Sequence, residues 1–288
     1  MRAKTIGIIA HPGKAGVTEL IPAVINEFEQ HSISVVVENA TAKLVGGNGA
    51  GTVEQIVGAA DLIVVLGGDG TILNVVGHAG ENLKPIFGIN VGSLGFLTSA
   101  NSSAYREVVH AIANERIAYS ERALLEVELR AGGQLLSTGR ALNDAVISRG
   151  DLSRLIRLEA KVNGDTLTEY NADGLIIATP TGSTAYSLSA GGPILEPDCG
   201  VFVITPICPH VLTNRSVIVN ESATIEIRPG STEYPTFLSI DGHAPERIPE
   251  DGVVVISRAT STLKLGFLPD VTFFSVLQQK LKWTGSNL

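Results

Sequence analysis

The pattern of apolar residues changes once along the chain, near residue 116, and this change restricts the folds that the chain can adopt. Before that point, four short apolar runs are separated by polar stretches, and residues between the first two runs have helical spacing from Leu20 to Phe28. The runs are Thr5–Ala10, Ser34–Glu38, Asp61–Leu66 and Pro85–Val91. Strands that alternate with helices form a parallel sheet covered on both faces. Residues 1–116 are therefore predicted to form an α/β domain.

Residues 117–266 have a different character, because short alternating segments follow one another with turn residues between them. These segments are residues 124–129, 145–148, 155–162, 174–179, 217–219, 223–227 and 253–256. The pattern predicts a β-rich second domain. Beyond it, the stretch from Val271 to Trp283 has helical character, and we expect the tail 267–288 to pack back on the first domain.

Composition argues against several functional classes. With 44% hydrophobic and 17% charged residues among 288, the chain can bury a sizeable core and does not resemble a disordered protein. The net charge of −8 argues against nucleic acid as a partner, although backbone amides can still bind phosphates locally. No stretch approaches the roughly twenty apolar residues of a membrane span, and the first apolar run is too short for a secretory signal. We therefore expect a cytoplasmic protein that binds neither membranes nor nucleic acid.

Two further features match no functional motif. Cys199 and Cys208 give neither a disulfide framework nor metal-ligand spacing. We interpret them as reduced thiols, with a single bridge between them as the alternative. The glycine cluster at residues 46–51 fits neither the GxGxxG nor the Walker A pattern, and we interpret it as a flexible connection.

A glycine-rich motif follows the run 61–66 and precedes a helical segment. It reads Gly67-Gly68-Asp69-Gly70-Thr71, and its position is the carboxyl end of a parallel strand, where open α/β sheets bind ligands. Glycines let the backbone approach a phosphate closely, and the N-terminus of the next helix favours anions. A carboxylate among them can hold a metal or accept a proton. The alternative is a turn whose aspartate only caps the next helix.

A second motif, residues 173–193, is dense in hydroxyls and small side chains. It begins at Asp173 and includes the run Pro180 to Ser189. A strand that ends in such a loop offers many hydrogen-bond donors and little bulk, which suits a polar ligand lying flat against the backbone. Tyr186 can stack on a base or hydrogen bond through its hydroxyl. The alternative is a turn with a packed tyrosine.

These two motifs carry a family resemblance. The first resembles the phosphate-handling loop shared by NAD kinases, diacylglycerol kinases, sphingosine kinases and phosphofructokinases. The second, residues 173–193, resembles the signature of NAD kinases over its whole length. Asn90–Leu97 resembles the segment that closes the first domain in that family.

Two later elements extend the resemblance, which runs from Asp61 to His243. Asn143-Asp144 stands where the family usually has Asn-Glu, so the carboxylate reaches less far. The stretch 239–243 resembles the family's late Asp-Gly element, with His243 in place of the polar amide often found there. A surface histidine is the alternative at that position.

The resemblance implies an α/β first domain, a β-sandwich-like second domain that binds NAD, and a homodimer or homotetramer. It implies transfer of the terminal phosphoryl group of ATP, or sometimes polyphosphate, to the 2′-hydroxyl of the adenosine ribose of NAD in NADP biosynthesis. Mg²⁺ or Mn²⁺ is expected to be carried by ATP without direct protein ligands. Asp69 is the expected general base, and Gly67, Gly68, Gly70 and Thr71 form the phosphate loop. The residues expected in the NAD site are Asp69, Gly70, Asn143, Asp144, Arg154, Asn171, Asp173, Thr184, Ala185, Tyr186, Ser187, Leu188, Ser189 and His243.

Two other functions stay open from the sequence. A lipid or sugar kinase can use the same glycine loop, but it has no need of residues 173–193. A dinucleotide sensor without enzymatic activity is the other alternative, and it has no use for Asp69.

Overall fold

The computed structural model describes residues 3–80, 82–92, 95–150, 154–211, 213–230 and 234–283. The chain divides into two compact units: the first unit comprises Met1–Glu121 with Leu263–Leu288, and the second comprises Arg122–Thr262. Ser93 and Leu94, within the expected segment Asn90–Leu97, lie outside the described residues.

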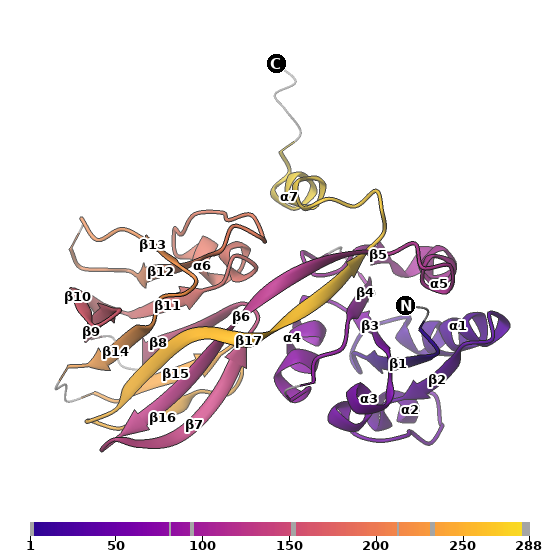
Figure 1. The fold of residues 1–288 in the computed structure, drawn as a ribbon, viewed down its shortest axis with the longest axis horizontal. Coiled ribbons are helices and arrows are strands. Elements are labelled where there is room, and N and C mark those ends of the chain that lie inside the picture. The colour runs from indigo at the N-terminus through magenta and orange to yellow at the C-terminus, as the bar shows by residue number, and fades with distance from the viewer. Residues whose placement is uncertain are drawn as a thin grey trace. The chain divides into compact units, whose positions relative to one another are not determined.

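The first unit alternates strands with helices, as Figure 1 shows. In chain order its elements are β1 (Thr5–Ala10), α1 (Val17–Gln30), β2 (Ser34–Val37), α2 (Asn39–Lys43), α3 (Val53–Ala59), β3 (Leu62–Gly67), α4 (Asp69–His78), β4 (Ile86–Asn90), β5 (Ala100–Asn101), a 3-10 turn (Ser102–Ala104), α5 (Tyr105–Ala113) and, after the second unit, α7 (Phe273–Leu281).

The strands of the first unit pair in the order β2-β1-β3-β4, and every one of these pairs is parallel. Every residue of β3 and β4 is buried, because helices cover both faces of the sheet. On one side α1 contacts α5, and on the other α3 contacts α4 (Figure 1). The chain runs from β1 outward to β2 and then returns to place β3 on the other side of β1. The strand order therefore reverses between β1 and β3.

The second unit is built almost wholly from strands. Its elements are β6 (Ala118–Ala131), β7 (Gln134–Ala141), β8 (Asp144–Arg149), β9 (Ile156–Val162), β10 (Asp165–Ala172), β11 (Gly174–Ala178), a 3-10 turn (Gly182–Thr184), α6 (Tyr186–Ser189), β12 (Val201–Ile207), β13 (Val217–Asn220), β14 (Ile225–Pro229), β15 (Thr236–Ile240), β16 (Glu246–Ile248) and β17 (Val253–Phe267). The first residues of β6 and the last of β17 belong to the first unit.

Two antiparallel layers form the second unit. One sheet has the order β13-β12-β11-β8-β15-β16, and the other contains β10-β9-β14-β17, with β6 pairing to both β17 and β7. A buried apolar cluster joins the two layers, with Leu158 and Ile227 from one sheet and Ile147 and Leu175 from the other. This is a β-sandwich, and the predicted fold class is confirmed for both units.

The sequence patterns did not predict some of these strands, and they underestimated the length of another. β12 contains Pro206, and a proline weakens the strand signal because it cannot donate to the ladder. β10 lies at the edge of its sheet and is largely polar. The last strand, β17, extends from Val253 to Phe267, well beyond the expected residues 253–256.

The glycine cluster at residues 46–51 connects α2 to α3, but its end is held in place. The backbone N–H of Ala50 donates to the Val37 carbonyl at 2.8 Å, and that of Asn39 donates to the Gly51 carbonyl at 2.8 Å. The interpretation as a flexible connection is therefore wrong for residues 50 and 51. Cys199 and Cys208 are both exposed free thiols, so the bridge between them is not formed.

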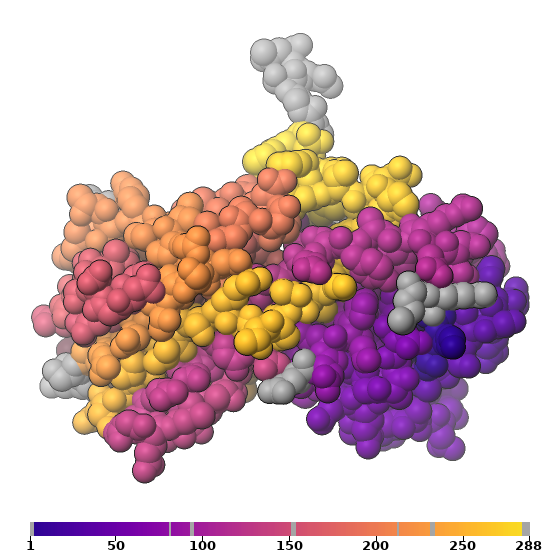
Figure 2. Space-filling view, viewed as in Figure 1, coloured from indigo at the N-terminus to yellow at the C-terminus, as the bar shows by residue number. Residues whose placement is uncertain are grey.

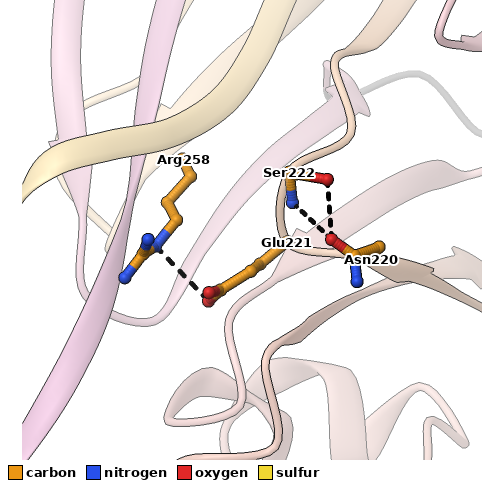
Figure 3. A network of polar contacts seen from close by, with 4 residues as sticks. All are labelled: Asn220, Glu221, Ser222 and Arg258. Carbon is orange, nitrogen blue, oxygen red and sulfur yellow. Dashed lines mark hydrogen bonds and ion pairs between the residues drawn. The ribbon is translucent and has the colours of Figure 1, made fainter.

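A polar network fixes the turn between β13 and β14, which carries the chain from one sheet to the other. Asn220 Oδ1 accepts hydrogen bonds from the backbone N–H and the hydroxyl of Ser222, at 2.9 and 2.7 Å. Next to it, the Glu221 carboxylate lies 3.4 Å from Arg258 Nε of β17 (Figure 3). An exposed ion pair of this kind contributes at most about 1 kcal/mol, so its main effect is to set the position of the turn.

The C-terminal helix α7 is amphipathic. Val276 and Leu277 are buried, whereas Phe274 is exposed; the atoms of this helix are among the bright yellow ones near the top of Figure 2. Thr272 and Ser275 cap its first turn reciprocally. Among the described residues, no helix combines the length and the apolar character that crossing a bilayer requires.

Candidate functional site

The first unit contains a cavity of about 780 Å³ at the carboxyl ends of its parallel strands. His11 and Pro12 line it directly after β1, Gly68–Thr71 directly after β3, and Asn90 at the end of β4. The strand order reverses between β1 and β3, and open α/β sheets bind their ligands in the crevice at such a switch point. The glycine motif therefore lies where the sheet topology favours a ligand.

The glycine loop leaves open space around two of its residues. Apart from its own chain neighbours, a Cβ atom added at Gly68 or Gly70 would meet no atom of the described residues within 4 Å, whereas one at Gly67 would collide with Thr71 Oγ1. Helix α4 begins at Asp69. The N–H of Thr71 donates to the Gly68 carbonyl at 3.0 Å, but the helix provides no partner for the N–H groups of Asp69 and Gly70, which can bind an anion. The loop therefore combines steric room with backbone donors, as a phosphate requires.

The Asp69 carboxylate is held by a neighbouring segment. Its Oδ2 accepts the N–H of Phe96 at 2.8 Å, and its Oδ1 accepts the N–H of Leu97 at 3.0 Å. The N-cap residue of α4 is Gly68, and no side chain caps this helix. The alternative that the aspartate only caps its helix is therefore wrong. Each carboxylate oxygen keeps a second lone pair for a ligand hydroxyl.

Two polar atoms in the cavity-lining residues are left without partners. Asn90 donates through Nδ2 to Thr98 Oγ1 at 3.2 Å, but its Oδ1 is buried and accepts no hydrogen bond from the part of the chain that the structure describes. Thr71 Oγ1 is likewise buried without a partner. An unsatisfied buried polar group costs about 1–3 kcal/mol, and such groups mark positions where a ligand can restore the missing bonds.

In the second unit, one carboxylate holds the Asn143-Asp144 turn. Asp241 Oδ2 accepts the N–H of Leu142 at 2.7 Å, and its Oδ1 accepts those of Asn143 and Asp144 at 2.8 and 3.0 Å. In return, the N–H of Asp241 donates to the Asp144 carbonyl at 2.9 Å. Asp241 has a φ of 48°, a left-handed conformation that aspartate adopts more readily than most residues. We call this arrangement the Asp241 clamp.

The Asp144 side chain is 5% exposed. Burial, together with the smaller effect of the nearby Asp241 carboxylate, raises its pKa from 3.8 to about 7. Burial also raises the pKa of Asp241, although its three N–H donors act in the opposite direction. Near neutral pH, Asp144 therefore exists partly as the neutral acid, which can donate a hydrogen bond as well as accept one.

The hydroxyls at the start of the second motif point inward and fix the loop. Thr179 Oγ1 donates to the Leu142 carbonyl at 2.5 Å and accepts the N–H of Gly182 at 3.1 Å. The Ser183 hydroxyl donates to the Pro180 carbonyl at 2.6 Å. These bonds connect the loop to the Asn143-Asp144 turn, so the structure brings these two expected parts of the site together.

Further along the same loop, the side chains of the expected site residues differ in how far they are exposed to solvent. The Ser187 side chain is fully buried, and its hydroxyl lies 2.9 Å from that of Thr205, so this side chain supports the loop from within the protein. Tyr186 is 47% exposed, which contradicts the alternative of a packed tyrosine. Thr184 donates to the Thr181 carbonyl at 3.2 Å. Ala185, Leu188 and Ser189 are partly or fully exposed.

The remaining expected residues make separate contacts. Asp173 Oδ1 accepts a hydrogen bond from Arg149 Nε at 2.8 Å, and the Asn171 carbonyl accepts the N–H of His210 at 2.8 Å. The exposed Arg154 guanidinium lies 5.4 Å from the centre of the Tyr234 ring, which belongs to neither loop.

His243 Nδ1 lies 2.9 Å from the Ile240 carbonyl. A carbonyl accepts only, so Nδ1 is the donor in this contact.

Sequence reasoning missed the residue that organises the second unit's site. Asp241 belongs to the late motif at residues 239–243, but nothing in the sequence indicates that its carboxylate holds a turn about a hundred residues earlier. Lys14, Glu38 and Lys280 also line the cavity of the first unit, and neither motif includes them. Within the described part of the chain, no three His, Cys, Asp or Glu side chains are grouped so that they could hold a metal ion.

A glycine loop and a helix N-terminus at the switch point of a parallel sheet define a phosphate-binding α/β protein, here joined to a β-sandwich. Residues 6–117 match the ATP-NAD kinase N-terminal domain, and residues 142–266 match the ATP-NAD kinase C-terminal domain. The chain therefore belongs to the NAD kinase family.

Individual relatives agree with this assignment. The NAD kinase of Solibacter usitatus is 41% identical over 97% of this chain and 98% of its own length. The NAD kinase of Trichlorobacter lovleyi is 42% identical over 89% of this chain and 90% of its own length.

Two solved structures are similar in fold. Yeast NADH kinase in complex with NADH has a TM-score of 0.89 at 27% identity, covering 100% of this chain and 90% of its own. An NAD kinase from Archaeoglobus fulgidus in complex with ATP has a TM-score of 0.74 at 25% identity, covering 98% of this chain and 100% of its own.

Proposed function

We infer that this chain is an enzyme that transfers the terminal phosphoryl group of ATP to the 2′-hydroxyl of the adenosine ribose of NAD, forming NADP. The observation that carries the inference is the cavity at the switch point of the first unit, where Asp69 lies beside an open glycine loop. Membership of the NAD kinase family supports the choice of substrates.

In the proposed reaction, the ribose oxygen attacks the γ-phosphorus, the bond from that phosphorus to the β–γ bridging oxygen breaks, and ADP leaves. The hydroxyl proton passes to a carboxylate oxygen of Asp69. The backbone N–H groups of Phe96 and Leu97 fix the direction of this carboxylate without occupying all its lone pairs. An aligned base contributes about 10²–10⁴-fold to such a rate, while positioning of the phosphates supplies much of the remainder.

The proposed donor site is the loop formed by Gly67, Gly68, Gly70 and Thr71. The backbone donors at the start of α4 face developing negative charge in this arrangement. The open space at Gly68 and Gly70 allows phosphate oxygens to approach the backbone.

The proposed NAD site in the second unit consists of the Asn143-Asp144 turn and the loop from Thr184 to Ser189. Asp173, which lies at the opposite end of β11, is proposed as a further contact. Asp144 offers a hydroxyl-binding carboxyl group, and Tyr186 offers an exposed ring face for a base. Arg154, Asn171 and His243 are proposed as further contacts. Within this loop, Ser187 contributes through its backbone and its support of the fold.

A divalent cation, Mg²⁺ or Mn²⁺, is proposed to enter with the donor. Its ligands would be phosphate oxygens of ATP, without direct protein ligands. The cavity fits such an ion, because the hard carboxylate oxygens of Asp69 and the amide oxygen of Asn90 in its lining favour a cation nearby. When bound, such an ion neutralises charge on the phosphates.

The proposed assembly is a homodimer or homotetramer in the cytoplasm. If the NAD site is completed near a subunit interface, apparent affinity will depend on protomer concentration. We expect a native mass of at least a dimer, and a specific activity that falls on dilution and recovers with NAD. A light-scattering mass equal to one 30.2 kDa chain with full activity would contradict the proposal.

The activity is tested by product analysis. NAD or NADH is incubated with ATP or polyphosphate and a divalent cation, and NADP or NADPH is measured. NADP formed from NAD and ATP supports the proposal. NAD binding without turnover would identify a sensor, and phosphorylation of a lipid or sugar in place of NAD would identify a different kinase.

A further inference from the structure

The proposed donor site has an electrostatic problem. A triphosphate carries several negative charges, and the chain has a net charge of −8. Asp69 and Glu38 add two carboxylates to the lining of the cavity. Hydrogen bonds from backbone N–H groups stabilise both carboxylates. Glu38 accepts the N–H groups of Ala40 and Thr41 at 2.7 Å each, and Asp69 accepts those of Phe96 and Leu97. Partial charges at the start of α4 offset only part of the repulsion, so the site needs fixed cations.

Two lysines from distant parts of the first unit line the same cavity. Lys14 lies in the turn after β1, and Lys280 lies in the last turn of α7. An ideal Cβ placed at Gly92 would be 3.8 Å from both Lys14 Nζ and Asn90 Oδ1, which places the ammonium group beside the end of β4. Within the described chain, no ion pair joins either lysine to a carboxylate.

The wall of the cavity provides an independent sign of a ligand. Thr71 is 8% exposed, and its buried hydroxyl, which can donate to a phosphate oxygen, has no partner among the described residues. Asn90 is 2% exposed, and its buried amide oxygen, which can accept from an ammonium group, has none either. Native proteins rarely leave such atoms unsatisfied. The lining of one cavity, beside the glycine loop, therefore contains the two lysines together with the polar side-chain atoms of Asn90 and Thr71 that lack partners among the described residues.

We propose that Lys14 and Lys280 bind the phosphates of the donor nucleotide, so that the C-terminal helix α7 is a functional part of the donor site. This inference rests on the proposed function, and it adds the cations that the motif residues do not supply. Lysine ammonium groups are compact charges on flexible stems, which suits contact with phosphate oxygens. Folding of α7 onto the first unit then becomes a condition for tight donor binding.

The chain offers matched controls for both lysines. Lys282 lies two residues after Lys280 but is exposed and absent from the cavity lining. Lys43, in the last turn of α2, is likewise exposed and does not line the cavity. Substituting these residues by alanine removes the same overall charge without touching the proposed site.

The test is calorimetric titration of the full chain with ATP and with inorganic tripolyphosphate, without NAD. Loss of one charge-assisted contact should weaken binding by about tenfold or more. We therefore expect Lys14→Ala and Lys280→Ala each to weaken binding of both probes by at least about tenfold. Lys43→Ala and Lys282→Ala should bind like the wild type, and Lys280→Arg should retain most of the affinity because it keeps the charge.

Steady-state kinetics separate this inference from the proposed function. The KM for ATP should rise in both lysine variants while the KM for NAD stays within about twofold, and circular dichroism should show a normal fold. Unchanged probe binding in a folded Lys280→Ala variant would overturn the inference even if the wild type makes NADP. A wild type that binds neither probe would overturn it too. Loss of probe binding in the variants of a chain that makes no NADP would uphold it and overturn the proposed function.

Discussion

The two proposed halves of the site differ in how their polar groups are used. In the first unit, the glycine loop borders an open cavity, and Asn90 and Thr71 keep polar atoms without partners. In the second unit, the Asn143-Asp144 turn is held by three hydrogen bonds from backbone N–H groups to one carboxylate, and the hydroxyls of the following loop point inward.

This difference indicates two tasks. A transferred phosphoryl group needs room and unsatisfied donors that become satisfied only when the ligand is present. Recognition of one dinucleotide needs a rigid surface whose shape does not depend on the ligand. Substitutions in the first unit should therefore affect turnover most, and those in the second unit should affect NAD affinity and stability.

The largest effect is expected at Asp69. Asp69→Asn removes the proposed base, so kcat should fall by at least about 10²-fold, while the KM for NAD changes much less. Because the carboxylate also accepts the N–H groups of Phe96 and Leu97, thermal unfolding must be measured beside the kinetics. A near-normal kcat would show that Asp69 is not the base, and it would contradict the proposal that the first unit determines turnover and the second unit NAD affinity.

The next effect concerns pH and Asp144. The pKa of this side chain is raised from 3.8 to about 7 in the folded protein, so the native state binds more protons than the unfolded chain between those values. Stability should therefore fall as pH rises through this window, by about 1.4 kcal/mol for each unit of pKa shift at most. Asp144→Asn removes the titration. Its melting temperature relative to wild type should increase from pH 4 to pH 8, and a constant difference would contradict the assignment.

A smaller change is expected when the Asp241 clamp is weakened. Asp241→Asn keeps one acceptor oxygen but places an amide N–H against a backbone N–H of the turn, which costs about 1–3 kcal/mol. We expect a several-fold higher KM for NAD, a lower melting temperature and a pKa of Asp144 closer to its ordinary value, because a negative charge is lost. Binding of ATP should not change. An unchanged KM for NAD would show that the turn does not need the clamp.

The smallest effect is expected at Tyr186. An aromatic contact contributes about 0.5–1.5 kcal/mol beyond its buried area, so Tyr186→Ala should raise the KM for NAD by about 2- to 10-fold. Tyr186→Phe keeps the ring and should be milder. Because the side chain is 47% exposed in the absence of a ligand, neither variant should unfold at a lower temperature. Equal KM values in all three proteins would remove the ring from the site.

The sequence predicted the parts of this molecule that depend on local patterns. Apolar runs separated by helical spacing indicated the parallel sheet, and the position of the glycine motif after a buried strand indicated its place at the sheet edge. Both follow because strand burial and turn chemistry are encoded within a few residues.

The remaining features depend on contacts between distant residues. The Asp241 clamp joins residues 97 to 99 positions apart, and Lys280 reaches the cavity from the far end of the chain. The direction of Ser187 could not be predicted either, because its burial depends on Thr205 in the neighbouring strand β12. Hydroxyl residues in a loop look alike in a sequence whether they face a ligand or the core.

The contrast among the glycines offers a way to map an invisible ligand by mutation. A Cβ at Gly182 would collide with the backbone of Asn143, so alanine there should prevent correct folding whatever the protein binds. At Gly68 and Gly70 a methyl group would meet no other described part of the chain within 4 Å. An alanine at either position that leaves the melting temperature unchanged but abolishes turnover therefore reports the surface of the bound substrate itself. In a systematic scan, the alanine variants that lose turnover but keep the wild-type melting temperature would identify the positions that contact the bound substrate.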